Sequence, residues 1–224
     1  MTRLTYEKLD EISIIRMDDG KANAMGSEMI AEVNEALDRA EEESRAVLIT
    51  GRPGLLSGGF DLNVIRSGDA ASIQSMINVG TKLLMRIYGF PKPIVMATGG
   101  HGVALGGFLL LAADYRLGVL GDYKIGLNEV AIGMTLPPFA LMLAKSRIAN
   151  QHLTNAAITA NLYDPEGAVK AGFLDEVSDP EELMPRSIQK TQALAQLDPS
   201  AFERTKNDFR RADIQHILAG LKSQ

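Results

Sequence analysis

The chain has 224 residues, of which 46% are hydrophobic and 23% charged, and its formal net charge is −5. This composition is typical of one large globular domain with a sizeable core, and the acidic balance gives no support for nucleic acid as a partner. The sequence has no cysteine, which excludes disulfides, a thiol nucleophile and cysteine-bound zinc, and no apolar run reaches the roughly 18 residues of a membrane span. With no apolar signal core at the start, we expect a cytoplasmic protein without a membrane partner.

The first hundred residues alternate between strand-like and helix-like patterns. The predicted elements are a hairpin over 4–9 and 12–17, a helix capped by Ser27 and ending near Glu43, a strand over 46–50, a helix capped by Asp69 and ending near Gly89, and a strand over 93–98. Strand, helix and strand at this spacing predict βαβ units and therefore a parallel sheet.

The later part of the chain becomes helical. After short strands that end near Gly118 and Ile125, a helix is predicted from Pro137 to about Ala149. From Asn150 onward the pattern is almost wholly helical, and the helix starts are Asp164-Pro165, Asp179-Pro180 and Asp198-Pro199. The prediction is an α/β core over 1–150 and a helical C-terminal region over 151–224.

Two glycine-rich turns are the strongest indication of chemistry. Residues 57–62, Ser-Gly-Gly-Phe-Asp-Leu, follow one apolar strand, and the glycine-rich stretch 99–107 follows another and opens into an apolar segment over 108–113 that predicts a buried helix. Glycine lets a ligand approach the backbone, and the first N–H groups of a helix have no intrahelical partner. Two such turns on neighbouring parallel strands can aim two N–H groups at one developing negative charge, as in an oxyanion hole. By itself, the 99–107 stretch is also explained by close helix–strand packing.

Glu129 is the candidate base. It lies in the apolar loop 126–133, where an unpaired charge would be unfavourable. General acid–base catalysis uses a carboxylate in such a dry setting. From the residues alone, a carboxylate that caps the following turn or pairs with an arginine explains the position equally well. The three histidines are scattered without the spacing of a zinc site or a triad, so no metal site is expected.

In this order and spacing, Ser57–Leu62 and Ala104–Gly107 resemble the crotonase superfamily, the enoyl-CoA hydratases and isomerases. Within it, Asp114-Tyr115-Arg116 and Ile125–Glu129 look most like the mitochondrial-type Δ3,Δ2-enoyl-CoA isomerases. The resemblance covers about residues 12–206. It implies an α/β, crotonase-like spiral of repeated ββα units with a C-terminal helical tail. It also implies a homotrimer or hexamer built through that tail, and an acyl-CoA thioester substrate that brings coenzyme A with it, so that no separate cofactor is needed.

The resemblance also implies roles for individual residues. Glu129 would be the catalytic base, and the backbone N–H groups of Phe60 and Gly107 would hold the thioester oxygen. The implied substrate-binding residues are Ser57, Gly58, Gly59, Asp61, Gly106, Asn128, Lys21 and Ala22. Gly59 and Gly106 would allow close approach, Asn128 would orient substrate, and Lys21 and Ala22 would receive the adenine end of CoA. A solvated turn explains Lys21 as well, and Asp61 is better explained as a turn or helix-start residue than as a base.

A missing acid favours isomerase over hydratase. Enoyl-CoA hydratases carry a second glutamate on the helix after the double glycine, where the two acids share one water. Here that helix is apolar, with Leu110 at the matching position. A 1,3-proton shift needs one base, whereas water addition needs a further group, for example from residues 63–90. Hydratase or other crotonase-type chemistry is the first alternative. The second alternative is a catalytically weak acyl-CoA-binding or interaction subunit. Glu129 in its apolar loop argues against it, because a pure binding protein needs no buried base.

Overall fold

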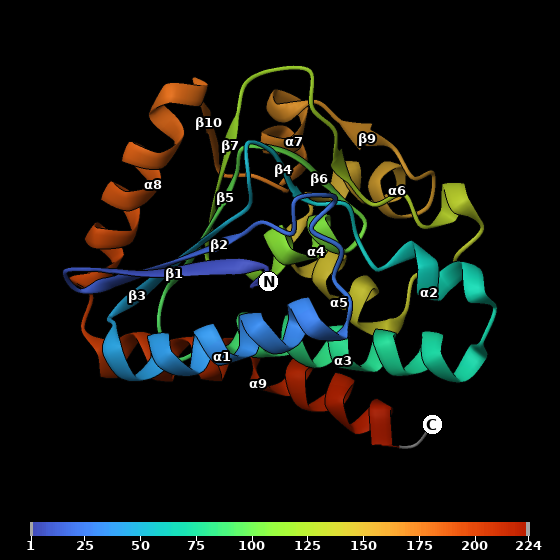
Figure 1. The fold of residues 1–224 in the computed structure, drawn as a ribbon, viewed down its shortest axis with the longest axis horizontal. Coiled ribbons are helices and arrows are strands. Elements are labelled where there is room, and N and C mark those ends of the chain that lie inside the picture. The colour runs from blue at the N-terminus through green and yellow to red at the C-terminus, as the bar shows by residue number, and fades with distance from the viewer. Residues whose placement is uncertain (1, 223–224) are drawn as a thin grey trace.

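Two β-sheets and the helices packed around them form residues 2–222, which are the residues described by this computed structural model (Figure 1). The strands are β1 (Leu4–Leu9), β2 (Ile12–Met17), β3 (Ala46–Thr50), β4 (Gly54–Ser57), β5 (Ile94–Thr98), β6 (Gly100–Val103), β7 (Tyr115–Val119), β8 (Ile125–Gly126), β9 (Leu162–Tyr163) and β10 (Glu176–Ser178). The helices are α1 (Ser27–Glu43), α2 (Leu62–Ser67), α3 (Ala70–Gly89), α4 (Leu105–Ala112), the 3₁₀ turn η1 (Val130–Ile132), α5 (Pro138–Arg147), α6 (Asn150–Ala157), α7 (Pro165–Ala171), α8 (Pro180–Ala195) and α9 (Pro199–Lys222).

The larger sheet has the strand order β1-β2-β3-β5-β7-β10 and is parallel except for the β1–β2 hairpin. Every residue of β3 and β5 is buried, as expected for strands covered on both faces. Alternate residues face opposite ways: Val47 and Ile49 join the core under α1 and α3, and Ala46 and Leu48 join a second core under α8. The predicted hairpin and parallel sheet are confirmed.

The smaller sheet, β4-β6-β8-β9, arises mainly because β3, β5 and β7 are each followed by a short strand that leaves the larger sheet. The orders β3-β4-α2-α3 and β5-β6-α4 give the repeated ββα unit that the resemblance implies, with the short helix α2 inserted in the first repeat. Strands β4 and β6 were not predicted, because they are short and glycine-rich. Glycine is required there by close backbone approach: a Cβ on Gly100 would lie 2.1 Å from the carbonyl of Gly54.

The C-terminal region packs against the α/β core of the same chain. Helix α8 covers one face of the larger sheet, and α9 lies along α3 on the other side (Figure 1). The expectation of an almost wholly helical region is wrong in one respect, since β9 and β10 extend the two sheets by pairing with β8 and β7. These strands have two and three residues, too short to show a pattern in the sequence. Contacts with a second copy stay a prediction.

Side-chain caps set the start of some helices, among them α2, α3 and α7, but not of others. Asp69 caps α3 as predicted, because its carboxylate accepts a hydrogen bond from the Ser72 N–H at 3.2 Å. Helix α1 begins one residue earlier than its predicted cap implies: Gly26 is the N-cap, and Ser27 is the first helical residue.

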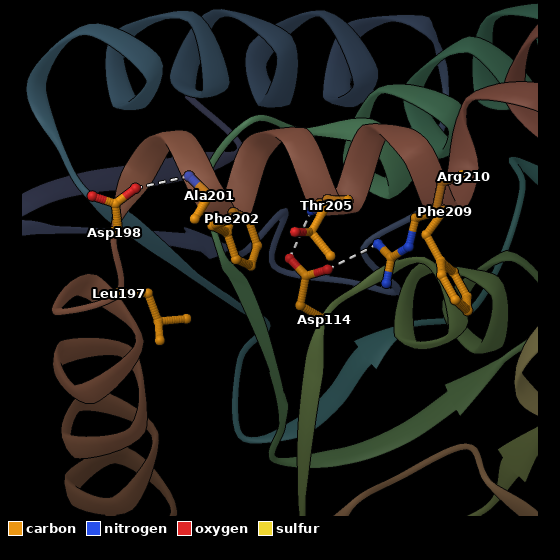
Figure 2. Close-up of a pocket in the computed structure, with 9 residues that line it drawn as sticks. Asp114, Leu197, Asp198, Ala201, Phe202, Thr205, Phe209 and Arg210 are labelled. Atoms are coloured by element: carbon orange, nitrogen blue, oxygen red, sulfur yellow. Dashed lines mark hydrogen bonds and ion pairs between the residues drawn. The ribbon is translucent and has the colours of Figure 1, made fainter.

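Asp114 fastens α9 to the sheet. One carboxylate oxygen accepts from Lys206 Nζ at 2.7 Å and from the Ile94 N–H at 2.8 Å, and the other accepts from Arg210 Nη1 at 2.8 Å. Figure 2 shows Asp114 directed at α9 beside a hollow of about 410 Å³. Burial lowers the pKa of Lys206 to about 8, against the attraction of Asp114. Both cations are buried, so this cluster depends on the single carboxylate at its centre.

Replacing Asp114 by Asn should therefore destabilise the fold. It leaves two buried cations without a counter-charge, and we expect the free energy of unfolding to fall by about 3 kcal/mol or more. Urea unfolding measures this, with Arg211→Gln as control. Within residues 2–222, the one ion pair of Arg211 is an exposed 4.0 Å pair with Asp208, so its loss should change the free energy of unfolding by about 0.5 kcal/mol at most. A loss below about 1 kcal/mol for Asp114→Asn would show that α9 is held by apolar packing instead.

Candidate active site

A cavity of about 890 Å³ opens between α2, α3, the 128–139 segment and the last turns of α9. Its lining is mostly apolar, and four of the residues singled out in the sequence contribute to it: Gly58, Phe60, Asn128 and Glu129. The glycine turn and the candidate base, which are some 70 residues apart in the sequence, are thus brought to one cavity.

Glu129 follows β8 and begins the turn η1. Its side chain makes no capping hydrogen bond, and no arginine pairs with it among the described residues, so neither structural explanation left open by the sequence applies. The residue is 8% exposed, and its Oε2 is buried without a hydrogen-bond partner in residues 2–222. Burial raises the pKa of Glu129 to about 7, although the nearby N–H groups of Glu129 and Asn128 favour the charged form. The site therefore holds a carboxyl group that can gain or lose a proton near neutral pH.

Asn128 adds a second unsatisfied acceptor beside the first. Its Oδ1 is also buried without a partner in the described part of the chain. Buried polar atoms are rarely left unpaired in native structures, so two of them on adjacent cavity-lining residues indicate that a ligand or water supplies the missing donor.

The first glycine turn presents the N–H of Phe60. Gly59 has φ of +106°, a conformation that favours glycine, and its carbonyl accepts from the Met25 N–H at 2.9 Å. The Gly58 N–H is used internally, since it donates to the Ala22 carbonyl at 2.9 Å. Within residues 2–222, the Phe60 N–H has no acceptor. It is therefore available to a ligand.

The second turn presents the start of α4. The first helical hydrogen bond runs from the Phe108 N–H to the Ala104 carbonyl at 3.2 Å, so the N–H groups of Leu105, Gly106 and Gly107 precede it. The helix begins three residues before the predicted 108–113 segment, within the glycines. A Cβ on Gly106 would lie 2.4 Å from the Ser57 carbonyl oxygen, which shows how closely the two turns approach. The predicted juxtaposition of the turns is present, and the role of their N–H groups stays a prediction.

Other residues proposed from the sequence support the turn from outside the cavity lining. The Ser57 hydroxyl is fully buried; it donates to the Asn23 carbonyl at 2.7 Å and accepts from the Gly59 N–H at 3.1 Å. Asp61 caps α2 by accepting from the Asn63 N–H at 2.8 Å, which agrees with its expected place at a helix start. Ser57 thus braces the turn with its side chain, and substrate contacts by Ser57 and Asp61 stay predictions.

Lys21 and Ala22 are exposed on a loop tied to the same turn. The Lys21 carbonyl accepts from Arg52, and that of Ala22 from Gly58. Their side chains do not line the cavity. The adenine role of this loop stays a prediction.

The sequence analysis assigned no individual residue to two walls of the cavity. Helix α3 contributes the stripe Gln74, Ile77, Asn78 and Thr81, and the end of α9 contributes His216, Ile217, Ala219, Gly220 and Leu221. The α3 stripe has i, i+3, i+4, i+7 spacing with polar members, a signal that was available. Nothing in the sequence indicated that α9 folds back over the site, and His216, one of the three scattered histidines, lies in this wall with an exposed side chain.

The inventory of acids in the cavity is short. Among the described lining residues, Glu129 is the only carboxylate. Leu110, which the resemblance matches to the second glutamate of hydratases, is fully buried in the core. Residues 2–222 contain no cluster of His, Asp and Glu side chains suited to a metal ion, and no helix among them is long and apolar enough to cross a membrane.

The raised pKa of Glu129 predicts a cost in stability that depends on pH. Between its ordinary pKa of 4.5 and about 7, the folded protein keeps a proton that the unfolded chain has released, so the free energy of unfolding falls as pH rises through this window. Glu129→Gln removes this term. At pH 8 the variant should be more stable by up to about 3 kcal/mol, and the difference should shrink towards zero below about pH 4.5.

Denaturant unfolding across this pH range tests the prediction, with the exposed Glu203→Gln as control. Equal stabilities of the Glu129→Gln variant and the wild type at pH 8 would show that the carboxylate is well solvated.

Comparison with known proteins places the whole chain in one group. Residues 7–221 match the family model described as enoyl-CoA hydratase/isomerase. Enoyl-CoA delta isomerase 1 from mouse mitochondria is 28% identical over 215 residues, which cover 92% of this chain and 73% of that protein.

Solved structures agree with the sequence match. An enoyl-CoA hydratase/isomerase family protein from Pseudomonas syringae is 38% identical, with a TM-score of 0.95 over 99% of this chain and 96% of that one. A Mycobacterium tuberculosis protein is similar at 38% identity and TM-score 0.94 in a structure that describes it as a probable enoyl-CoA hydratase, covering 98% of this chain and 93% of that one. Another structure of the same protein describes it as an enoyl-CoA isomerase. It is 37% identical to this chain with a TM-score of 0.93, and the match covers 99% of this chain and 96% of that one. The chain therefore belongs to the enoyl-CoA hydratase/isomerase family, shares its crotonase fold and is an enzyme of that family.

Proposed function

We propose that the protein is a Δ3,Δ2-enoyl-CoA isomerase in which Glu129 is the single acid–base group. The observation that carries this proposal is the buried carboxyl of Glu129, whose Oε2 has no hydrogen-bond partner in residues 2–222 and which is the only carboxylate among the described lining residues. A substrate whose C2 lies against Glu129 gives up a proton from that carbon, and the electrons of the C–H bond move into an enolate. The same carboxyl then returns the proton to C4, which moves the double bond from C3–C4 to C2–C3.

The pKa of Glu129 suits both halves of this transfer. Because the pKa of Glu129 is about 7, about half of the carboxyl groups are ionised at neutral pH and can accept the C2 proton, and the protonated form is stable enough to return it. With substrate in the cavity, the mostly apolar lining would limit the access of water that exchanges with this proton. No second base is required.

The enolate oxygen would be held by the N–H groups of Phe60 and Gly107. Both are free of backbone acceptors in the described residues, and loss of one such donor typically costs about 10²–10³ in rate. Gly107 is unsuited to mutation, because any Cβ there would lie 2.7 Å from the Gly126 carbonyl oxygen. Gly58, Gly59 and Gly106 would permit the approach of the thioester, and Asn128 would orient it.

The other parts of the proposal follow from the family. Coenzyme A arrives as part of the substrate, and a proton shift consumes no further cofactor. We also propose that the adenine end of CoA lies near Lys21 and Ala22, that the protein works in the cytoplasm, and that it assembles as a trimer or hexamer.

Hydration of 2-enoyl-CoA is the second candidate function. It is favoured by the side chains of Gln74 and Asn78, which supply polar groups to the cavity from the segment where such a group was sought. The two amides are hydrogen-bonded to each other at 2.9 Å. An amide can orient a water molecule but cannot remove its proton, so Glu129 would have to do so alone.

Parallel assays of the purified protein with 3-enoyl-CoA and with 2-enoyl-CoA distinguish these functions. We expect 2-enoyl-CoA from the first substrate and little 3-hydroxyacyl-CoA from the second. Rapid hydration without comparable isomerisation would overturn the proposal.

Glu129→Gln should remove isomerisation while preserving the fold and acyl-CoA binding. Loss of general-base catalysis lowers the rate by about 10²–10⁴ or more, because glutamine cannot accept the C2 proton. Turnover of 3-enoyl-CoA measures this, and the exposed Glu203→Gln variant should retain full activity. A Glu129→Gln variant that keeps more than about a tenth of the wild-type rate would remove Glu129 from the mechanism.

A further inference from the structure

The ring of Phe60 occupies the space of a missing side chain on α3. A Cβ built on Gly80 would lie 2.5 Å from Phe60 Cε1 and 2.7 Å from Phe60 Cζ. Gly80 is buried in the middle of a 20-residue helix, where glycine is less favourable than alanine. The contact with the ring explains why glycine is found at this position.

Gly80 lies at the edge of the α3 stripe that faces the cavity. Ile77 and Thr81 on either side of it line the cavity, whereas Gly80 itself does not. Phe60 does line the cavity, so its ring stands between Gly80 and the open space. The size of residue 80 therefore decides how far the ring withdraws from the cavity.

We propose that Gly80 is a specificity-determining residue that acts through Phe60 and sets the width of the cavity beside the thioester. This inference rests on the proposed function in one respect: the Phe60 N–H is taken to hold the thioester oxygen. The ring on that same residue must then lie close to the first carbons of the acyl group. A ring pushed outward from α3 narrows the space there, and a methyl branch on the second acyl carbon is the first group to lose room.

Binding of two saturated thioesters tests this without requiring turnover. The probes are butanoyl-CoA, which is unbranched, and 2-methylpropanoyl-CoA, which carries the branch, and calorimetry gives the ratio of their dissociation constants. Gly80→Ala should shift this ratio against the branched ester by about fivefold or more, because overpacking moves the ring into the cavity. Phe60→Ala, which keeps the backbone N–H, should shift the ratio by a similar factor in favour of the branched ester.

The double variant separates this role from a structural one. With the ring absent, an alanine at position 80 has no Phe60 atoms to meet, so Gly80→Ala should leave the ratio of the Phe60→Ala protein unchanged. Ser75→Ala, on the exposed side of the same helix, should leave the wild-type ratio unchanged. If the Gly80→Ala variant fails to fold, restoration of folding by adding Phe60→Ala supports a clash between residue 80 and the Phe60 ring. The ratio of dissociation constants in the Phe60→Ala variant then still tests whether the ring sets the specificity.

Two results would overturn the inference. One is an unchanged ratio in Gly80→Ala or in Phe60→Ala, and the other is an effect of Gly80→Ala that persists without the ring. If both thioesters bind the wild type but the ratio of their dissociation constants is unchanged in the variants, only this inference fails. If neither thioester binds, the proposed function fails and the inference fails with it.

Discussion

Backbone packed directly against backbone is the constraint on which the rest of this structure depends. Where the chain leaves the larger sheet for the smaller one, and again where the smaller sheet leads into α4, no side chain separates the segments. A Cβ on Gly100, Gly106 or Gly107 would lie 2.1, 2.4 or 2.7 Å from a backbone atom of a neighbouring strand or turn. This approach sets the Phe60 turn beside the start of α4, so that two N–H groups can serve one oxygen.

The half-buried carboxylate of Asp114 and the buried carboxylate of Glu129 have different roles in this fold. Asp114 receives hydrogen bonds from Lys206, Arg210 and the Ile94 N–H, and it holds α9 against the sheet. Glu129 lines an apolar cavity with an oxygen that has no partner in residues 2–222. The first arrangement stabilises the protein, and the second destabilises it while giving a carboxyl group whose pKa suits proton transfer at neutral pH. The ion cluster around Asp114 helps to keep α9, and with it one wall of the cavity, in place.

The sequence predicted those parts whose signal is local. Continuous apolar runs bounded by turns indicated β3 and β5, and an acid in an apolar loop indicated Glu129. Strands β4 and β9 were missed because they have four and two residues and form only by pairing with distant strands. The wall made by α9 was missed because α9 meets α3 only after the chain has folded. The bracing role of the Ser57 hydroxyl depends on Asn23, which lies far from it in the sequence.

The central claim is that one carboxyl group carries one proton from C2 to C4, and the fate of that proton tests it most directly. A single turnover of 3-enoyl-CoA deuterated at C2, in ordinary water, can be followed by mass spectrometry of the product. The account predicts 2-enoyl-CoA with a measurable part of the deuterium at C4, because the proton waits on Glu129 in a cavity of mostly apolar lining. Product with no deuterium at C4, together with 3-hydroxyacyl-CoA formed by water addition, would contradict it.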